Sequence, residues 1–138
     1  MRSGLLVLLA ALTAIVPARA DDDKKQAVHK VTQSKSYLMV DPIYATIVSN
    51  DHPSGLLMIG IGIDVPDETL RAEADHAMPV LRDAYVRNMM AFAATQVRTF
   101  RQPDVTVIAS RLQAVTDRAL GRKGARVLLA QVAMRLTN

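Results

Sequence analysis

The sequence predicts a small α+β domain with the element order ββααβ. Apolar residues alternate with other residues in two segments between residues 37 and 65 and in a third near the C-terminus, whereas they recur every three or four positions between residues 68 and 120. The first spacing is typical of a strand with one buried face and the second of an amphipathic helix. The 138 residues leave room for one such domain. We expect an antiparallel hairpin and a C-terminal strand, packed together on two amphipathic helices.

The N-terminus has the features of an export signal. Arg2 precedes an apolar run from Leu5 to Val16, and Ala18-Arg19-Ala20 follows it as a small-residue cleavage sequence. The run is much shorter than the about 20 residues that a helix needs to cross a bilayer. We predict that residues 1–20 are a signal peptide cleaved before Asp21, or a short retained anchor, and that the remainder lies in the periplasm.

Residues 21–36 are expected to form a flexible charged linker. Asp21-Asp22-Asp23 is followed by two lysines and then by polar residues as far as Ser36. Adjacent carboxylates in such a segment are not held in a coordination shell, so we predict no metal site there. The folded domain is expected to occupy residues 37–138.

The hairpin is predicted from two neighbouring segments. Residues 37–49 are rich in β-branched and aromatic residues, and Pro42 within them indicates an edge or bulged strand. Residues 50–55 have the composition of a turn. In the next strand Gly60 and Gly62 lie on the face where we expect a helix or another backbone to approach. The opposite face is packed, and its residues are Leu57, Ile59, Ile61, Ile63 and Val65.

A long helix is expected after Pro66, because Asp67 and Glu68 suit the positive end of a helix dipole. Pro79 cannot donate a backbone hydrogen bond, so a kink or restart is predicted near Met78. The apolar stripe of this helix consists of Leu70, Ala74, Ala77, Leu81, Tyr85, Met89 and Phe92, and it ends at Gln96.

A second helix is expected over residues 105–119, and Gly121 suits its C-terminal cap. Its stripe consists of Val105, Ile108, Leu112, Val115 and Ala119. The final strand is expected over residues 125–136. Its apolar alternation consists of Leu128, Ala130, Val132, Met134 and Leu136.

The residue types needed for catalysis are sparse. The chain has no cysteine, and its three histidines do not have the spacing of metal ligands. Asp51-His52-Pro53-Ser54 contains the residue types of a hydrolase, but neighbouring residues on a turn point apart, which favours a polar turn. Gly60-Ile61-Gly62 lacks the third glycine of a dinucleotide-binding loop. We predict no catalytic site, no metal and no cofactor.

The charge pattern suggests a protein or membrane surface as partner. The formal charge of +4 falls to +2 without residues 1–20, and aromatic residues make up only 4% of the chain, so no binding to nucleic acid is expected. Arg111, Arg118 and Arg122 share one side of the second helix. They are the predicted partner-facing residues, for an acidic protein or anionic lipid; a solvated helix face is the alternative.

Several of these segments together resemble the periplasmic domain of the FliL family of flagellar basal body-associated proteins. The resemblance rests on Tyr37, Asp41-Pro42, the strand 56–65, Asp67-Glu68 and the segment Met78 to Val86 with its Pro-x-Leu-Arg-Asp sequence, and it covers about residues 37–137. It implies a fold related to the stomatin domain and a non-enzymatic role at the inner membrane that supports the stator and flagellar motility. It also implies self-association into rings around the periplasmic part of the stator.

The short N-terminal segment departs from this family, whose members usually keep a full-length transmembrane helix. A soluble periplasmic binding module that shares the fold without a flagellar role is therefore a second hypothesis. An enzyme that uses His52 is a third.

Overall fold

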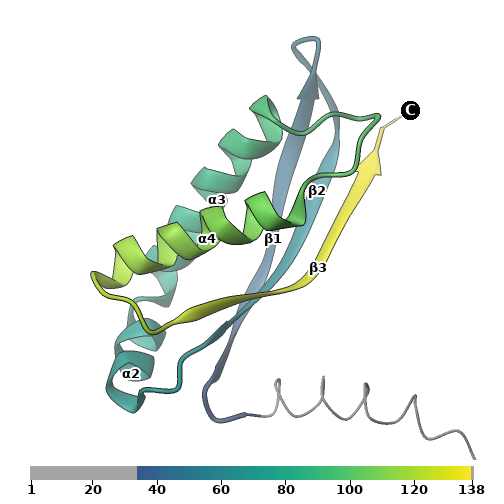
Figure 1. Cartoon of the computed structure of the whole chain (residues 1–138). Coiled ribbons are helices and arrows are strands. Elements are labelled where there is room, and N and C mark those ends of the chain that lie inside the picture. Colours follow the sequence, from purple (N-terminus) through teal and green to yellow (C-terminus); the bar gives the residue numbers. More distant parts are fainter. Residues whose placement is uncertain (1–33, 138) are drawn as a thin grey trace, which may run out of the picture. The chain divides into compact units, whose positions relative to one another are not determined.

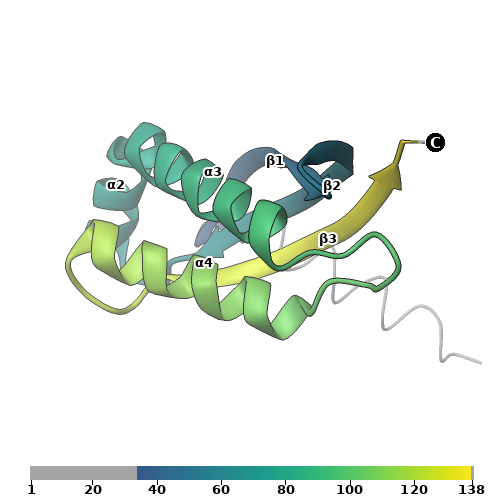
Figure 2. The same cartoon turned by 90° about the horizontal axis from the view of Figure 1, so that it is seen from above.

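A three-stranded antiparallel sheet carries the helices of the domain on one of its faces (Figures 1 and 2). The computed structural model describes residues 34–137, so the predictions for residues 1–33 lie outside the described part. The strands pair in the order β1-β2-β3. The elements are β1 (Tyr37–Ser49), β2 (His52–Asp64), α2 (Glu68–His76), α3 (Met78–Thr95), α4 (Val105–Leu120) and β3 (Arg126–Leu136). The predicted α+β class, the hairpin and the C-terminal strand are confirmed.

The hairpin turn is tighter than predicted. Asn50 and Asp51 both have positive φ angles, of 53° and 62°, and Ser49 already pairs with His52. Two consecutive left-handed residues match the twist of a hairpin, and asparagine and aspartate tolerate this conformation well. Because they reverse the chain, Pro53 and the two residues after it belong to β2, and the prediction of a turn as far as Gly55 is wrong.

β1 is a bulged edge strand, as Pro42 indicated. Val40 pairs with Ile61 and Ile43 with Ile59, so the register shifts across Asp41 and Pro42. The shift turns both Val40 and Ile43 toward the core, where both are buried. A proline is compatible with this position because a bulge leaves a residue outside the hydrogen-bonded ladder.

The packed face of β2 is confirmed, but the glycines have a different neighbour from the expected one. All five odd-numbered residues from Leu57 to Val65 are buried. A Cβ at Gly62 would collide with the aromatic ring of Tyr37, and Gly60 lies against Gln131 of β3. No described helix approaches either glycine, because α3 and α4 pack on the opposite face (Figure 2). The prediction of a helix or backbone beside Gly62 is therefore wrong: the space is filled by the Tyr37 ring of the adjacent strand.

β3 changes its inward side halfway along. Ile61 pairs with Leu129 and Gly60 with Gln131, so Ala130 is an extra residue in the ladder. Val132 and Met134 pack against the core as predicted, whereas Val127 and Leu129 do so in place of Leu128 and Ala130. One extra residue exchanges the two faces of a strand, which is why a single alternation failed.

The predicted long helix consists of α2 and α3, so the order is ββαααβ. α2 ends at His76 and α3 begins at Met78. This break is the helix restart that Pro79 predicted. Pro79 lies in the first turn of α3, where no backbone N–H partner exists within the helix. The buried residues of the two helices follow the predicted stripe, and they include Leu70, Ala74, Leu81, Tyr85, Met89 and Phe92.

α4 begins where predicted, ends one residue later than predicted, and has the predicted C-terminal cap. Asp104 caps its N-terminus, and Gly121 closes its C-terminus with a left-handed φ of 67°. Val105 and Ala119, the first and last residues of the predicted stripe, are exposed, so the stripe is shorter than predicted. The core side of α4 also includes the polar Thr116. No helix among the described residues is long and apolar enough to cross a membrane.

Candidate interaction surface

The three arginines predicted to face a partner have three different surroundings. The Arg111 guanidinium lies over the Phe92 ring, 5.3 Å from the ring centroid. Arg122 Nη2 lies 3.0 Å from Glu73 Oε2 of α2. Arg118 lines a hollow of about 440 Å³ between α3 and α4, together with Arg87 and Asn88. One shared helix face thus does not produce one shared arginine patch.

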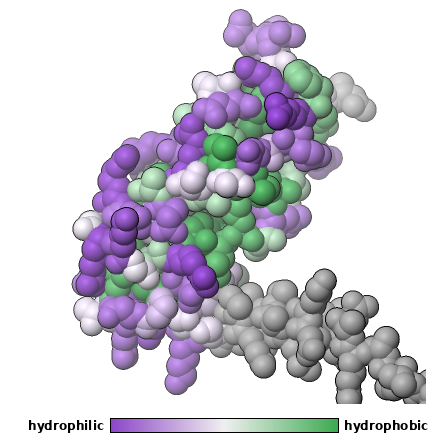
Figure 3. All heavy atoms as spheres, in the orientation of Figure 1, coloured by the Kyte–Doolittle hydropathy of each residue, from purple (hydrophilic) through white to green (hydrophobic). Residues whose placement is uncertain are grey.

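A second group of arginines lies around the loop between α3 and α4. A hollow of about 440 Å³ has Phe92, Val97 and Val107 among its lining residues, with Arg98 and Arg101 beside them. A smaller hollow of about 270 Å³ lies between the loop and the end of β3. Figure 3 shows strongly hydrophilic and hydrophobic side chains next to one another at this upper end of the molecule. We call residues 96–104 with these two hollows the loop surface.

Phe100 is the most exposed large apolar residue described. Its side chain is 86% exposed, and it lines the smaller hollow with Met134 and Leu136. Arg98, Arg101 and Arg111 make no ion pair with any described residue. The carboxylate of Asp104 accepts hydrogen bonds from the backbone N–H groups of Thr106 and Val107, at 2.8 Å and 3.3 Å. The loop surface therefore combines an exposed aromatic ring with unmatched positive charge.

The sequence analysis assigned no role to these residues. The available signal was Arg98-x-Phe100-Arg101, a large apolar residue among cations where loop composition would favour small polar residues. The contribution of Phe92 and Met134 depends on the tertiary fold, and no local pattern reveals it.

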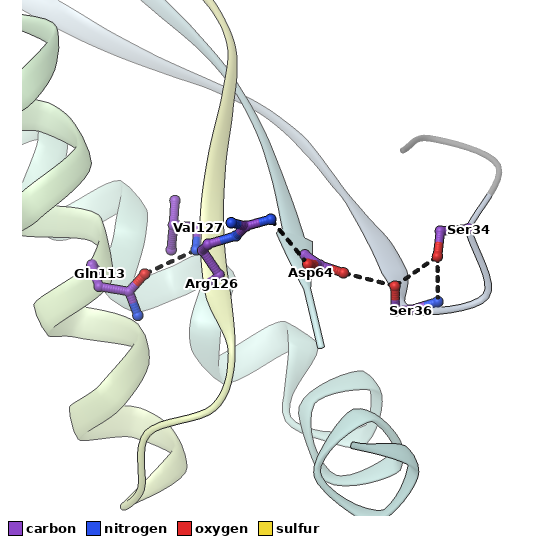
Figure 4. A network of polar contacts seen from close by, with 6 residues as sticks. All are labelled: Ser34, Ser36, Asp64, Gln113, Arg126 and Val127. Atoms are coloured by element: carbon purple, nitrogen blue, oxygen red, sulfur yellow. Dashed lines mark hydrogen bonds and ion pairs between the residues drawn. The ribbon is translucent and has the colours of Figure 1, made fainter. Parts of the chain in front are cut away.

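The chain enters the domain at a polar network (Figure 4). Ser36 Oγ donates to Asp64 Oδ1 at 2.7 Å, and Arg126 Nη2 donates to Asp64 Oδ2 at 3.3 Å. Gln113 of α4 accepts from the backbone N–H of Val127 at 2.9 Å. The start of β1 is thereby joined to the end of β2 and the start of β3, while the loop surface lies at the other end of the sheet (Figure 1).

The sheet face away from the helices is also partly apolar. Met39, Tyr44 and Leu56 are exposed on this face, with Met58 beside Tyr44 in the ladder. No described element covers it.

The residues of the hydrolase hypothesis do not converge. Ser54 Oγ donates to the backbone carbonyl of His52 at 3.0 Å, so the hydroxyl is not directed at the imidazole. The described residues contain no group of three His, Cys, Asp or Glu side chains that could hold a metal. The candidates that the described domain offers are surfaces.

Two segments of the FliL resemblance meet in the fold. Asp41 in the β1 bulge and Arg82 in the first turns of α3 form an ion pair, with 3.7 Å between Asp41 Oδ2 and Arg82 Nε. These residues are far apart in the sequence, and the antiparallel ladder together with the α2–α3 connection brings them together. The sequence itself matches no model of a known protein family, and a search of curated proteins finds no significant relative.

Proposed function

We propose that this chain is an exported, non-enzymatic interaction protein of the FliL type, which supports the flagellar stator and motility at the inner membrane. The observation that carries the proposal is the contact between Asp41 and Arg82, because each belongs to a different segment of the resemblance.

The Pro-x-Leu-Arg-Asp segment has a consistent structural role. Pro79 starts α3, and Leu81 and Tyr85 are fully buried against the sheet. Arg82 reaches Asp41, while Asp83 pairs with Arg87 one turn later. The exposed pairs contribute little stability, since surface ion pairs are worth about 0–1 kcal/mol. The buried side chains of Leu81 and Tyr85 therefore fix how α3 packs on β1, and the ion pairs add little to this packing. A defined packing role for the segment is compatible with a shared fold.

Self-association is part of the proposal, and the edges of the sheet support it. β1 and β3 are both edge strands in the described domain. Both edge strands carry a bulge, but only β1 also contains a proline, Pro42, which removes a backbone donor and hinders pairing with another strand. The backbone of β3 is thus the better edge for a second copy, by addition of a strand to the sheet.

Deletion of the gene followed by motility assays tests the flagellar role. We expect reduced spreading in soft agar and reduced torque under load, both restored by the wild-type gene. A charge-reversed pair, Asp41→Arg with Arg82→Asp, is the matched variant, because it keeps the ion pair while altering both residues. Unchanged spreading and normal torque in the deletion strain would overturn the proposal.

A soluble periplasmic binding module is the second candidate function. The short apolar run before Ala18-Arg19-Ala20 favours it, because it suits a cleaved signal better than a spanning helix. Osmotic-shock fractionation with N-terminal sequencing separates the two candidates. Release of a chain that begins at Asp21 favours the soluble module, and retention in the inner membrane favours the FliL-type role.

A further inference from the structure

We propose that the loop surface is a docking site for an acidic segment of another protein that carries a large apolar side chain. This inference does not depend on the flagellar role. It rests on the shape of the loop, the two hollows beside it and its unmatched charge.

The loop is held in a defined shape although its tip is exposed. Val97 is buried at one end, and Asp104 is fixed at the other end by the cap of α4. Between them the backbone N–H of Arg101 donates to the carbonyl of Arg98 at 3.2 Å. Phe100 is thereby presented to solvent by a loop with fixed ends, which lowers the entropy lost when a partner binds.

The two hollows can accept apolar side chains. Their volumes are about 440 Å³ and 270 Å³. A cavity of about 150 Å³ is enough to hold benzene, so either hollow has room for a leucine or phenylalanine side chain. Phe92 and Val107 provide an apolar lining in the larger hollow, and Met134 and Leu136 do so in the smaller one.

The charge of the loop surface selects an acidic partner. Arg98 and Arg101 line the larger hollow and have no acidic partner among the described residues. The nearby carboxylate of Asp104 already accepts two backbone hydrogen bonds. Guanidinium groups bind carboxylates through two parallel hydrogen bonds, which gives geometric selectivity as well as attraction.

A protein segment fits this site better than a membrane does. The hollows are concave and suit single inserted side chains, whereas a bilayer surface favours a convex apolar face. The described chain begins at the other end of β1, a strand of 13 residues, which at about 3.3 Å per residue places the loop surface roughly 40 Å from the start of that strand.

The test uses a fluorescein-labelled peptide with a central Leu-Phe pair between two runs of glutamate, and the full mature protein. Fluorescence anisotropy at low salt should show saturable binding that weakens as salt rises, because the contact includes exposed charges. A peptide with glutamine in place of glutamate, and another with alanine in place of Leu-Phe, should each bind at least several-fold more weakly. Absence of binding up to about 1 mM would overturn the proposal, since specific protein interactions are tighter than that.

Two variants locate the site. Phe100→Ala should weaken the acidic peptide by about tenfold, as expected for an exposed aromatic anchor. Arg98→Ala with Arg101→Ala should weaken it by roughly five- to tenfold, because each exposed charge pair contributes modestly. Circular dichroism and thermal melting of each variant check that the fold is retained; the side chains changed are exposed, so both should match the wild type.

Matched controls remove the same groups elsewhere. Arg118→Ala with Lys123→Ala removes two positive charges at the opposite end of α4, and Tyr44→Ala removes an exposed aromatic ring from the outer sheet face. Both should bind the peptide as the wild type does. Equal losses in these controls, or tighter binding to phosphatidylglycerol vesicles than to the peptide that is abolished by Phe100→Ala, would overturn the proposal. Phe100-dependent self-association without peptide binding would do so too.

Discussion

Removing the hydroxyl of either Tyr85 or Thr116 tests the one buried polar contact between α3 and α4. Tyr85 Oη and Thr116 Oγ1 lie 2.6 Å apart, and both residues are fully buried. Thr116 Oγ1 donates its single proton to the carbonyl of Leu112 at 2.8 Å. Both hydrogen bonds can form only if the tyrosine donates to the threonine.

This direction of donation makes the two substitutions unequal. Tyr85→Phe removes the donor but leaves the Thr116 hydroxyl bonded to Leu112, so it should cost about 1 kcal/mol of unfolding free energy, the value of one typical hydrogen bond. Thr116→Val leaves the buried tyrosine hydroxyl with no partner, and an unpaired buried group costs about 1–3 kcal/mol. The double variant replaces both groups by apolar ones of similar shape and should cost less than the sum.

Thermal and urea unfolding of the mature protein measure these differences. For a domain of this size, 1 kcal/mol corresponds to a shift in Tm of about 4–8 °C. We expect Thr116→Val to melt below Tyr85→Phe, and the double variant to melt no lower than Thr116→Val alone. Strictly additive single effects, or a Tyr85→Phe variant less stable than Thr116→Val, would refute the proposed donor direction.

Three further predictions follow from individual contacts. Burial raises the pKa of Tyr85 above its ordinary value of 10.0. An unfolded tyrosine ionises first, so the stability should fall above about pH 10, and less so in Tyr85→Phe, as urea midpoints across alkaline pH will show. Asp104→Ala removes the side chain that caps α4 and should cost about 1 kcal/mol by thermal melting, whereas Asp104→Asn should retain most of the stability. Gly62→Ala should change the free energy of unfolding more favourably in a Tyr37→Ala background than in the wild type, by about 1 kcal/mol, because the added Cβ then meets no ring. Equal changes in both backgrounds would contradict this packing.

The parts of the fold that depend on local chemistry were predictable from the sequence. Pro79 marked the restart of a helix, Gly121 marked the end of one, and Pro42 marked a bulged edge strand. In each case one residue type has a backbone property that few alternatives satisfy. Such signals survive tertiary context because they act within a few residues of the chain.

The errors arose where register depends on a neighbouring strand. Nothing in the composition of β3 marks Ala130 as an extra residue, because alanine fits either face of a strand. The alternation was therefore assigned to the wrong face for half of the strand. In the same way Gly62 showed that a side chain was excluded, but only the pairing of β1 with β2 shows that the excluded volume belongs to Tyr37.

The candidate site was less predictable for a related reason. Helical spacing placed Arg111, Arg118 and Arg122 together, but function depends on which charges remain unmatched after folding. Glu73, far away in the sequence, forms an ion pair with Arg122, and the guanidinium of Arg111 lies over the ring of the buried Phe92.

Partner binding should concentrate where the fold leaves charge and apolar surface unsatisfied at the same place. Asp64 holds both Ser36 and Arg126 at the end where the chain enters, so the charges of that network are already matched. At the other end Phe100 is exposed beside Arg98 and Arg101, which make no ion pair within the described part of the chain. A partner gains little by replacing a satisfied ion pair, whereas an unpaired guanidinium can form a new ion pair with a partner's carboxylate, which offsets the cost of removing its water. The two ends of the sheet therefore differ: charges are paired at the end where the described chain begins, and the loop surface at the other end is the proposed site for a partner.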